Sequence, residues 1–509
     1  KSTKKKNQGY IGEKGIGFKS VFKVTSKPHI ISNGYSICFP EEEEITGLGY
    51  IVPQWVEKLP DKLINNSHTT IILPLNKIEI NYSDVEKMLH DIQPEIILFL
   101  TKIKEIRIQT NKVSMMRIWK DDSLLPLVKI YVEKKRLVNS YLDSFEFLFF
   151  SKSFNRPPEI IQEKRENIRE REVSIAFPIN NNQRGIGKIF AYLPVRSDSG
   201  LPFLINGDFI LPSSREDIRD VPWNRWLMTC ASELVKTSLP ELKERNLLKV
   251  NFLEALISRL NNISEDKDSI FYPIFVAVRD VLLNTELLPT DDKTFVSARN
   301  AKLARGEWLR KLLREEQLKQ LFKTNAPLKW ISSDVTESSI LWKFFRNELK
   351  IDVIYPDTFA RKVDIHFFEK QSDKWFIEFY RQLIEQRNLW KKRFTNSIWN
   401  GDVPLREKPI IRTQNGQHVK PFSDDGLPNV YLPIEINGDI SLPVVKTKIA
   451  DDKSARIFLK ELGIPELDIV EEVIKYVIPK YSSTSKPTSL KDHLSDIDKI
   501  KHAYKTAKF

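Results

Sequence analysis

Three glycines within six residues, close to the start of the sequence, have the spacing of a phosphate-binding loop. Gly12, Gly15 and Gly17 let a ligand approach the main chain closely. Apolar side chains follow at helical spacing, so a helix is predicted to begin near Ile16, and its first amides attract anions. Lys14 adds positive charge. The order G-x-x-G-x-G matches neither the dinucleotide fingerprint nor the P-loop. Spacing alone therefore leaves a plain glycine-rich turn as an equal alternative.

The segments after this run predict the sheet that must position it. Residues 23–39 are typical of strand, turn and strand, with Asn33-Gly34 as the turn. The segment His68-Thr-Thr-Ile-Ile-Leu-Pro-Leu75 predicts a further strand. Thr69 and Thr70 are also ordinary β-branched strand residues, and taken alone they indicate no more than that.

Residues 12–22 resemble the second glycine box of the GHKL ATPases, the superfamily of gyrase, MutL, histidine kinases and the large heat-shock chaperone. The resemblance implies a Bergerat-type α/β sandwich that binds ATP with Mg²⁺. It also implies that Thr69 is the threonine of the superfamily's final strand, although His68 replaces the usual preceding glycine. The residues that it assigns to the nucleotide are Gly12, Lys14, Gly15, Ile16, Gly17, Phe18 and Thr69.

Within this superfamily the chain is most similar to large proteins of the sacsin and NO VEIN type. The run 12–22, the stretch Leu193 to Asp217 and the segment Trp223-Asn-Arg-Trp226 carry the likeness, which extends over nearly the whole chain. In the heat-shock chaperone a Ser-Arg-Glu setting presents an arginine to the terminal phosphate, and Arg215 matches it. A planar, permanently charged group suits phosphate oxygens.

The bland interpretation of Arg215 is a surface salt bridge with Glu216, Asp217 or Asp208. The segment from Asn206 to Asp208 is expected to form a turn and to take no part in catalysis.

The family's catalytic Glu, metal-binding Asn and adenine-binding Asp lie upstream of the glycine box, and only eight residues precede Gly9. We therefore expect an N-terminally truncated fragment that binds nucleotide weakly or not at all and is inactive alone. ATP and Mg²⁺ are expected only in the full-length protein, and Glu13 is expected to face solvent or to cap the helix.

Composition narrows the class of protein. The 509 residues carry 80 basic and 68 acidic side chains, a net charge of +12. The basic excess is spread out, so solvated surface is the preferred interpretation and nucleic-acid binding a minority one. Cys38 and Cys230 have no neighbour at ligand spacing, which predicts buried thiols, no metal site and an intracellular compartment, cytoplasm or nucleus. No apolar run is long enough to span a membrane.

The predicted fold class is α+β, in five parts: a partial GHKL domain (1–110), a strand-rich α/β domain (111–225), a mainly helical region (226–400), a hairpin-plus-helix module (401–480) and a flexible tail (481–509). Residues 162–172 are expected to form an exposed connection. The expected strands are 103–109, 117–119, 128–132, 173–178 and 188–193. The expected helices are 85–100, capped by Asp84 and kinked or divided at Pro94, then 226–239, 252–260, 274–283, 307–322, 340–349 and 375–389.

Residues 287–296 resemble residues 409–419, which predicts two copies of a hairpin-plus-helices module. Three functions follow from these observations. The first is an ATP-binding, chaperone-like or regulatory protein when full length. The second is a non-catalytic scaffold whose helical half binds protein partners. The third is a nucleic-acid-associated ATPase of the MORC type, disfavoured because the sequence lacks a zinc-finger CW pattern.

Overall fold

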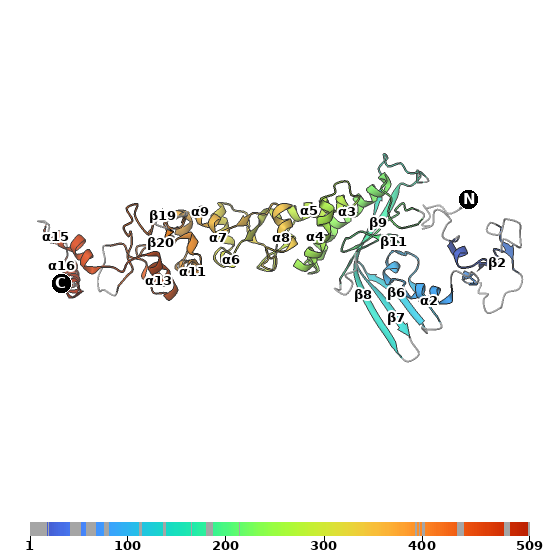
Figure 1. Cartoon of the computed structure of the whole chain (residues 1–509), viewed down its shortest axis with the longest axis horizontal. Coiled ribbons are helices and arrows are strands. Elements are labelled where there is room, and N and C mark those ends of the chain that lie inside the picture. The colour runs from blue at the N-terminus through green and yellow to red at the C-terminus, as the bar shows by residue number, and fades with distance from the viewer. Residues whose placement is uncertain are drawn as a thin grey trace. The chain divides into compact units, whose positions relative to one another are not determined.

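The computed structural model shows a mixed α+β protein, as predicted (Figure 1). It describes residues 18, 20–40, 52–56, 68–75, 81–110, 115–135, 139–163, 165–179, 187–212, 214–391, 394–395, 398–399, 403–434, 442–482 and 489–506. Two compact units emerge, one of residues 1–248 and 255–278 and one of residues 249–254 and 279–509. The finer five-part division remains a prediction.

Unit 1 begins with a four-stranded antiparallel sheet in the order β3-β2-β1-β4. Its strands are β1 (His29–Ser32), β2 (Tyr35–Cys38), β3 (Gln54–Trp55) and β4 (Thr70–Ile72). Asn33 and Gly34 join β1 to β2 with φ angles of 47° and 79°, which suits a type I′ hairpin turn. The hairpin and the later strand predicted from the sequence are confirmed.

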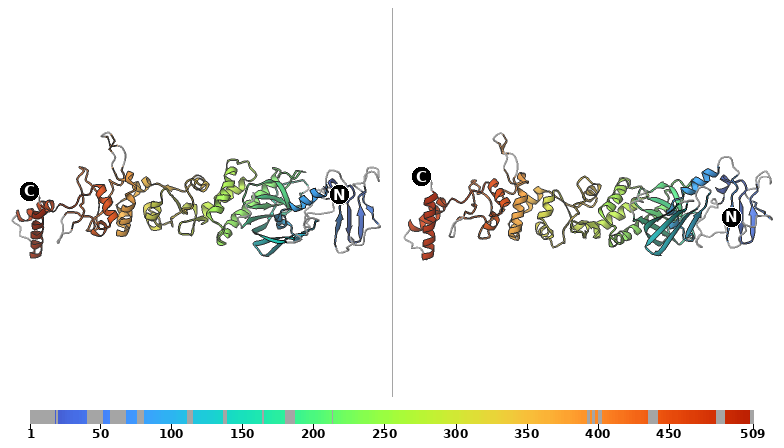
Figure 2. Two further views of the ribbon diagram at one scale, coloured as in Figure 1. Left: turned by 60° about the horizontal axis from the view of Figure 1, so that its bottom comes forward. Right: turned by 90° about the horizontal axis from the view of Figure 1, so that it is seen from below.

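An eight-stranded sheet follows in the order β11-β10-β12-β9-β8-β7-β6-β5, and Figure 2 shows it from two further sides. Its strands are β5 (Glu105–Ile108), β6 (Met115–Leu124), β7 (Leu127–Lys135), β8 (Ser140–Asn155), β9 (Glu170–Pro178), β10 (Lys188–Ala191), β11 (Leu193–Asp198) and β12 (Leu204–Asn206). The long strand β8 was not predicted. Its first five residues (140–144) are all exposed, so the sequence there lacks the alternation of apolar and polar residues that indicates a strand.

The helix predicted over residues 85–100 is divided at Pro94. An α-helix, α2 (Tyr82–His90), precedes a 3₁₀ segment, η4 (Pro94–Phe99). The cap is Asn81, whose side chain accepts from the amide of Asp84, while the Asp84 carboxylate accepts from the amide of Asn81. Asp84 is thus the second member of a capping box and not the cap itself.

Three helices close unit 1 and lead into unit 2: α3 (Pro222–Glu244), α4 (Val250–Ser264) and α5 (Tyr272–Asn284). They contain the three predicted helices. Helix α3 lies against β8 and β9 and buries Trp223 and Trp226. Cys230 of α3 and Cys38 of β2 are buried thiols, as predicted, and neither is in a disulfide. No helix in the described part of the chain is both long and apolar enough to cross a membrane.

Much of unit 2 packs short helices and very short strands around an aromatic core that includes Phe368, Phe376, Tyr380 and Trp390. Its strands are β13 (Leu288–Pro289), β14 (Phe295–Val296), β15 (Ala301–Ala304), β16 (Lys329–Trp330), β17 (Val353–Ile354), β18 (Phe394–Thr395), β19 (Ile398–Trp399), β20 (Ile411–Arg412) and β21 (His418–Val419). Its α-helices are α6 (Glu307–Leu312), α7 (Glu315–Phe322), α8 (Ile340–Asn347), α9 (Pro356–Lys362), α10 (Ile365–Glu369), α11 (Asp373–Leu383), α12 (Thr447–Ala450), α13 (Lys453–Leu462), α14 (Ile469–Glu472), α15 (Ile478–Ser482) and α16 (Leu490–Thr506), and the π-helix η8 (Val473–Val477) connects α14 to α15. Helices α14, η8 and α16 meet in a separate apolar cluster.

The single helix predicted over residues 307–322 is broken into α6 and α7. The indole of Trp375 donates to the carbonyl of Leu312 (2.9 Å), and the indole of Trp330 donates to that of Leu313 (2.6 Å). Two distant tryptophans thus take up carbonyls that a continuous helix would use itself. The apolar spacing hides this break because both halves face the same core.

Both predicted hairpins form, and the hydrogen bonds around them recur. Residues 288–354, the first module, begin with β13 and β14, and residues 411–467, the second module, begin with β20 and β21. The Thr290 hydroxyl donates across its turn to the carbonyl of Thr294 (2.8 Å), and the Thr413 hydroxyl donates to that of Gln417 (3.0 Å). The two threonines form antiparallel bridges with Ile331 and Val445 respectively.

The likeness extends to the parallel strands behind each hairpin. The amide of Leu303 donates to the carbonyl of Asp352 (3.0 Å), and that of Leu432 donates to Pro465 (2.8 Å). A residue with positive φ follows the last helix of each module: Lys350 (53°), three residues after α8, and Gly463 (101°), directly after α13. The predicted duplication is therefore a repeated fold, from which the first module departs by the inserted helices α6 and α7.

Within the segment predicted as a tail, residues Leu490–Thr506 form the helix α16. Lys499 and Asp496 on this helix are buried, and the ammonium of Lys499 lies 3.2 Å from the Glu472 carboxylate. This helix was not predicted because its inward face is largely polar, so its sequence shows no apolar stripe that would indicate a packed helix.

His418 of the second module provides a test of this core. It is 9% exposed, and among the described residues neither ring nitrogen has a hydrogen-bond partner. Burial, reinforced by the nearby charge of Arg412, lowers its pKa from 6.5 to about 4. The folded chain therefore holds this imidazole neutral where the unfolded chain protonates it.

We expect the free energy of unfolding to fall as the pH falls from 6.5 to 4, because the unfolded state binds the extra proton. The loss attributable to His418 is up to about 3 kcal/mol. His418→Phe, which copies Phe295 of the first module, should remove that part of the pH dependence in urea unfolding. His366→Phe on the exposed surface should leave it unchanged. An unaltered slope in His418→Phe would contradict the assignment.

Candidate functional site

Most of the predicted phosphate loop, namely Gly12, Lys14, Gly15, Ile16 and Gly17, lies outside the described residues. Of the residues assigned to the nucleotide, the structure describes Phe18 and Thr69. Both residues contact the four-stranded sheet or a residue directly after one of its strands.

Phe18 anchors the chain directly after the glycine run. Its ring lies 6.1 Å from that of Phe22 and 5.3 Å from that of Phe39, and the latter two are 5.8 Å apart. The amide of Phe39 donates to the carbonyl of Pro28 (3.0 Å), just before β1. Phe18, the residue that follows the glycine run in the sequence, therefore packs near the end of β1 at which that strand begins.

Thr69 lies at the opposite end of β1. Its hydroxyl is 2.7 Å from the hydroxyl of Ser32, the last residue of that strand. His68 and Thr69 are both exposed. Since a strand rises about 3.3 Å per residue, the two anchoring points are separated by roughly 10 Å along β1.

Arg215 follows the eight-stranded sheet in a tight turn with φ of 56°. The carbonyl of Arg215 accepts from the amide of Arg196 (3.2 Å) on β11. Its guanidinium donates weakly, at 3.4 Å, to the carbonyls of Ala191 and Leu193. Partial burial lowers the pKa of Arg215 below its ordinary value. No hydrogen bond or ion pair among the described residues joins it to Thr69.

The salt bridges considered for Arg215 are not those that form. Asp208 binds other arginines, Glu216 lies 3.3 Å from Arg196, and the Asp217 carboxylate accepts from the amide of Ile218. Within the described ranges no carboxylate lies within 4 Å of the Arg215 guanidinium. Arg215 therefore contacts only main-chain carbonyls and keeps its charge unmatched.

A buried ionic cluster supports the segment that leads to Arg215. Asp208, 5% exposed, takes Arg165 on one carboxylate oxygen (3.1 Å) and Arg171 on the other (2.9 Å). Its carbonyl accepts from Arg165 and from the indole of Trp223, and the guanidinium of Arg165 lies over that indole, 4.8 Å from its centre. Residues 162–172 were expected to form an exposed connection, but Arg165 within them is 3% exposed and residues 170–172 belong to β9.

The predicted turn around Gly207 is a short reversal inside this cluster. The amide of Phe209 donates to the carbonyl of Gly207 (2.8 Å). The Asn206 side chain accepts from the amide of Tyr192 (2.9 Å), and burial raises the pKa of Tyr192 to about 12. Sequence reasoning missed the cluster because its members are scattered over some sixty residues with no fixed spacing.

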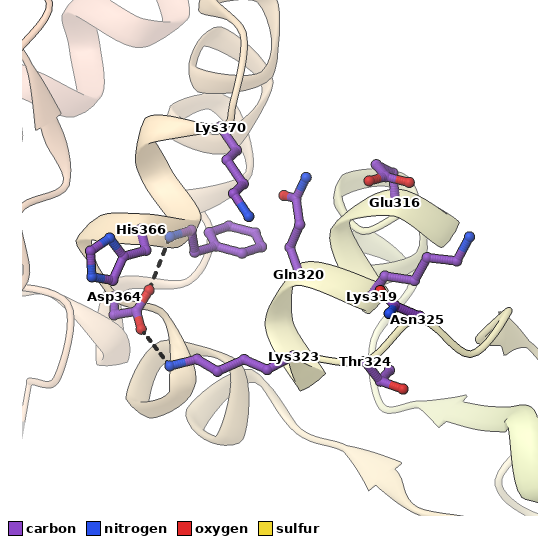
Figure 3. Close-up of a pocket in the computed structure, with 10 residues that line it drawn as sticks. Glu316, Lys319, Gln320, Lys323, Thr324, Asn325, Asp364, His366 and Lys370 are labelled. Atoms are coloured by element: carbon purple, nitrogen blue, oxygen red, sulfur yellow. Dashed lines mark hydrogen bonds and ion pairs between the residues drawn. The ribbon is translucent and has the colours of Figure 1, made fainter.

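Unit 2 contains a separate pocket of about 460 Å³ between α7 and α10, drawn in Figure 3. A buried amide fixes its walls, because Gln371 donates to Gln320 of α7 (2.6 Å) and to the carbonyl of Phe367 (2.8 Å). Lys323 is matched by Asp364 at 3.0 Å, and Lys319 by Glu315 at 2.9 Å. Carboxylates of the same chain thus pair with two of the three lysines that line the pocket. Because most of the charge is neutralised, the lining favours polar ligands and shows no strong preference for a charged one.

Among the described residues, no group of three or more histidine, cysteine or carboxylate side chains could hold a metal ion. We therefore assign no metal ligand to this chain.

The Asp208 cluster gives a stability test. Asp208→Ala leaves two guanidinium groups without their carboxylate, so the free energy of unfolding is expected to fall by about 3–5 kcal/mol. Glu216→Ala, which breaks an exposed pair with Arg196, should cost less than about 1 kcal/mol. Urea unfolding followed by circular dichroism measures both. If both variants lost the same free energy of unfolding, the buried cluster would stabilise the fold no more than an exposed ion pair does.

Comparison with known proteins gives one informative similarity. A scan against protein-family models finds no match. The chain is 35% identical to Protein NO VEIN of Arabidopsis thaliana over 252 residues, which cover 45% of this chain and 9% of that protein. The chain thus spans a small part of that relative's length. Over the matched stretch it is NO VEIN-like.

Proposed function

We propose that this chain carries the phosphate-binding half of a GHKL-type ATP site and belongs to a NO VEIN-like, sacsin-related protein that binds ATP. The sequence of residues 12–22 and the 35% identity to a NO VEIN protein support the family. In the whole protein we propose a chaperone-like or regulatory role for this site.

The observation that carries the proposal is the arrangement of the two anchors on β1. Phe18 packs near one end of the strand, and Ser32 binds Thr69 at the other. A nucleotide is an extended ligand with a base at one end and phosphates at the other. A separation of roughly 10 Å along a four-residue strand suits contacts to its two ends.

The proposed roles follow from chemistry. The amides of Gly15 and Gly17 and the ammonium of Lys14 would bind phosphate oxygens, and Thr69 would face the base. Arg215 would meet the charge that develops on the terminal phosphate. ATP would supply the reactive phosphoanhydride bond, and Mg²⁺ would neutralise the charge of the phosphates. In this proposal the general base and the metal ligand come from other parts of the full-length protein.

Replacing the glycines tests the loop. In the full-length protein, Gly15→Val with Gly17→Val should weaken ATP binding about tenfold or more, because the side chains occupy the space of the phosphates. Isothermal titration calorimetry measures the affinity. Gly416→Asn with Gly426→Asn, in exposed turns of unit 2 with left-handed φ, is the matched control and should bind normally. Equal ATP affinity in both variants would remove the loop from the site.

Replacing Arg215 separates binding from chemistry. Arg215→Ala should slow phosphate release by the full-length protein on the order of 10³-fold, with little change in ATP affinity. Arg196→Ala, on the neighbouring strand and paired with Glu216, should retain the wild-type rate. A full-length protein that hydrolyses ATP equally fast in both variants would assign Arg215 to structure alone.

A second candidate function is a protein-interaction scaffold. Helix α16 turns Lys499 and Asp496 inward, whereas Leu490, Leu494 and Tyr504 are 76%, 55% and 74% exposed. Exposed apolar side chains gathered on one helix mark a protein-binding surface more often than a solvated one. If the full-length protein fails to bind ATP, this function becomes the preferred one.

A further inference from the structure

A small pocket lies at the carboxyl ends of two parallel strands in the first module. Arg305 and Tyr355 directly follow β15 and β17, and the amide of Arg305 donates to the carbonyl of Ile354 (3.0 Å). Helix α8 supplies the facing wall, and the cavity measures about 220 Å³. Ligands of parallel sheets bind outside this edge, where successive strands end and the chain turns away.

The charges in this pocket do not balance. Arg305, Lys343 and Arg346 line it together with one carboxylate, that of Glu337. The Glu337 carboxylate lies 3.4 Å from Arg305, and both side chains are about half exposed, so water screens the pair. Among the residues that the structure describes, no carboxylate lies within 4 Å of Lys343 or Arg346. These two cations stand one helical turn apart on α8 and face the same cavity.

The second module shows how the same fold neutralises such cations. Arg456 and Lys460 of α13 bind the carboxylate of Glu466 at 3.2 Å and 3.1 Å, and together they lower the pKa of that carboxyl. Arg456 corresponds to Lys343, because each is the fourth residue after the capping residue of its helix.

The residue that replaces the carboxylate in the first module is apolar. Glu466 pairs in parallel with Leu432, and Val353 pairs in the same way with Leu303. Val353 therefore occupies the strand position of Glu466. The first module keeps Lys343 at the place of Arg456 and has Asn347 at the place of Lys460, while Arg346 supplies a second cation to the pocket. It lacks the internal anion, so an anion from outside the chain can complete the pocket.

We propose that this pocket binds a phosphate group, carried by inorganic phosphate or by a small phosphate monoester. The planar fork of an arginine matches phosphate oxygens. Arg305 is held in place over the ring of Tyr355, 5.3 Å from its centre. Since a water occupies about 30 Å³, the cavity has room for a phosphate and a small organic substituent but not for a nucleotide. This site belongs to unit 2 and does not depend on the proposed ATP site.

Phosphate titration of the full chain tests the proposal. At constant ionic strength, ³¹P line broadening should show saturable binding of inorganic phosphate. Lys343→Ala with Arg346→Ala should weaken it at least about tenfold, because two charge-assisted hydrogen bonds are lost. Val353→Glu supplies an internal carboxylate at the strand position that Glu466 occupies in the second module, and it should compete with the ligand. Circular dichroism verifies that each variant folds.

The second module supplies the matched control. Arg456→Ala with Lys460→Ala removes the same amount of charge from the same fold and should leave the affinity unchanged. Glycerol phosphate in place of inorganic phosphate distinguishes the two sources: tighter binding assigns a monoester, and weaker binding assigns the free ion. Absence of saturation in the wild-type chain, or equal losses in the two double variants, would overturn the proposal.

Discussion

Unit 2 depends on one constraint, which is that the amides and carbonyls of very short strands must be paired before they can be buried. Most of its strands have two residues, too few to form a stable sheet by themselves. Thr290 and Thr413 meet this constraint in the same way. Each closes its own turn through its hydroxyl and then bridges to a third segment of backbone. The two modules share these main-chain bonds and differ in the inserted helices α6 and α7 and in side chains at equivalent positions.

The framework tolerates different side chains as long as the main-chain bonds survive. At equivalent places the two modules carry Phe295 and His418, and Val353 and Glu466. The first difference buries an imidazole that the fold must keep neutral. The second decides whether cations on the preceding helix are paired with a carboxylate inside the chain. Duplication thus gives two copies of one scaffold with opposite electrostatics at the same strand edge.

Local chemistry made part of the fold predictable from the sequence. The Asn33-Gly34 hairpin, the division at Pro94 and the two polar hairpins depend on residues close together in the chain, so their patterns were readable. The break between α6 and α7 depends on indoles from Trp330 and Trp375, and no local window contains them. The Asp208 cluster and the polar inner face of α16 escaped for the same reason. The candidate residues could be named from a family resemblance, but the partners of Arg215 could not.

The arginines of unit 1 show why the partner of a cation matters more than its presence in a motif. Arg165 and Arg171 share the buried carboxylate of Asp208, so both arginines are paired inside the protein and stabilise the segment around Asp208. Arg215 is partly buried beside carbonyl oxygens alone, which lowers its pKa and leaves the fold with an uncompensated cost. A cation kept in that condition is stabilised by any anion that reaches it. The same reasoning separates Lys343 and Arg346 from Arg456 and Lys460, and in both units we propose that a phosphate binds beside the cation that has no carboxylate partner among the described residues.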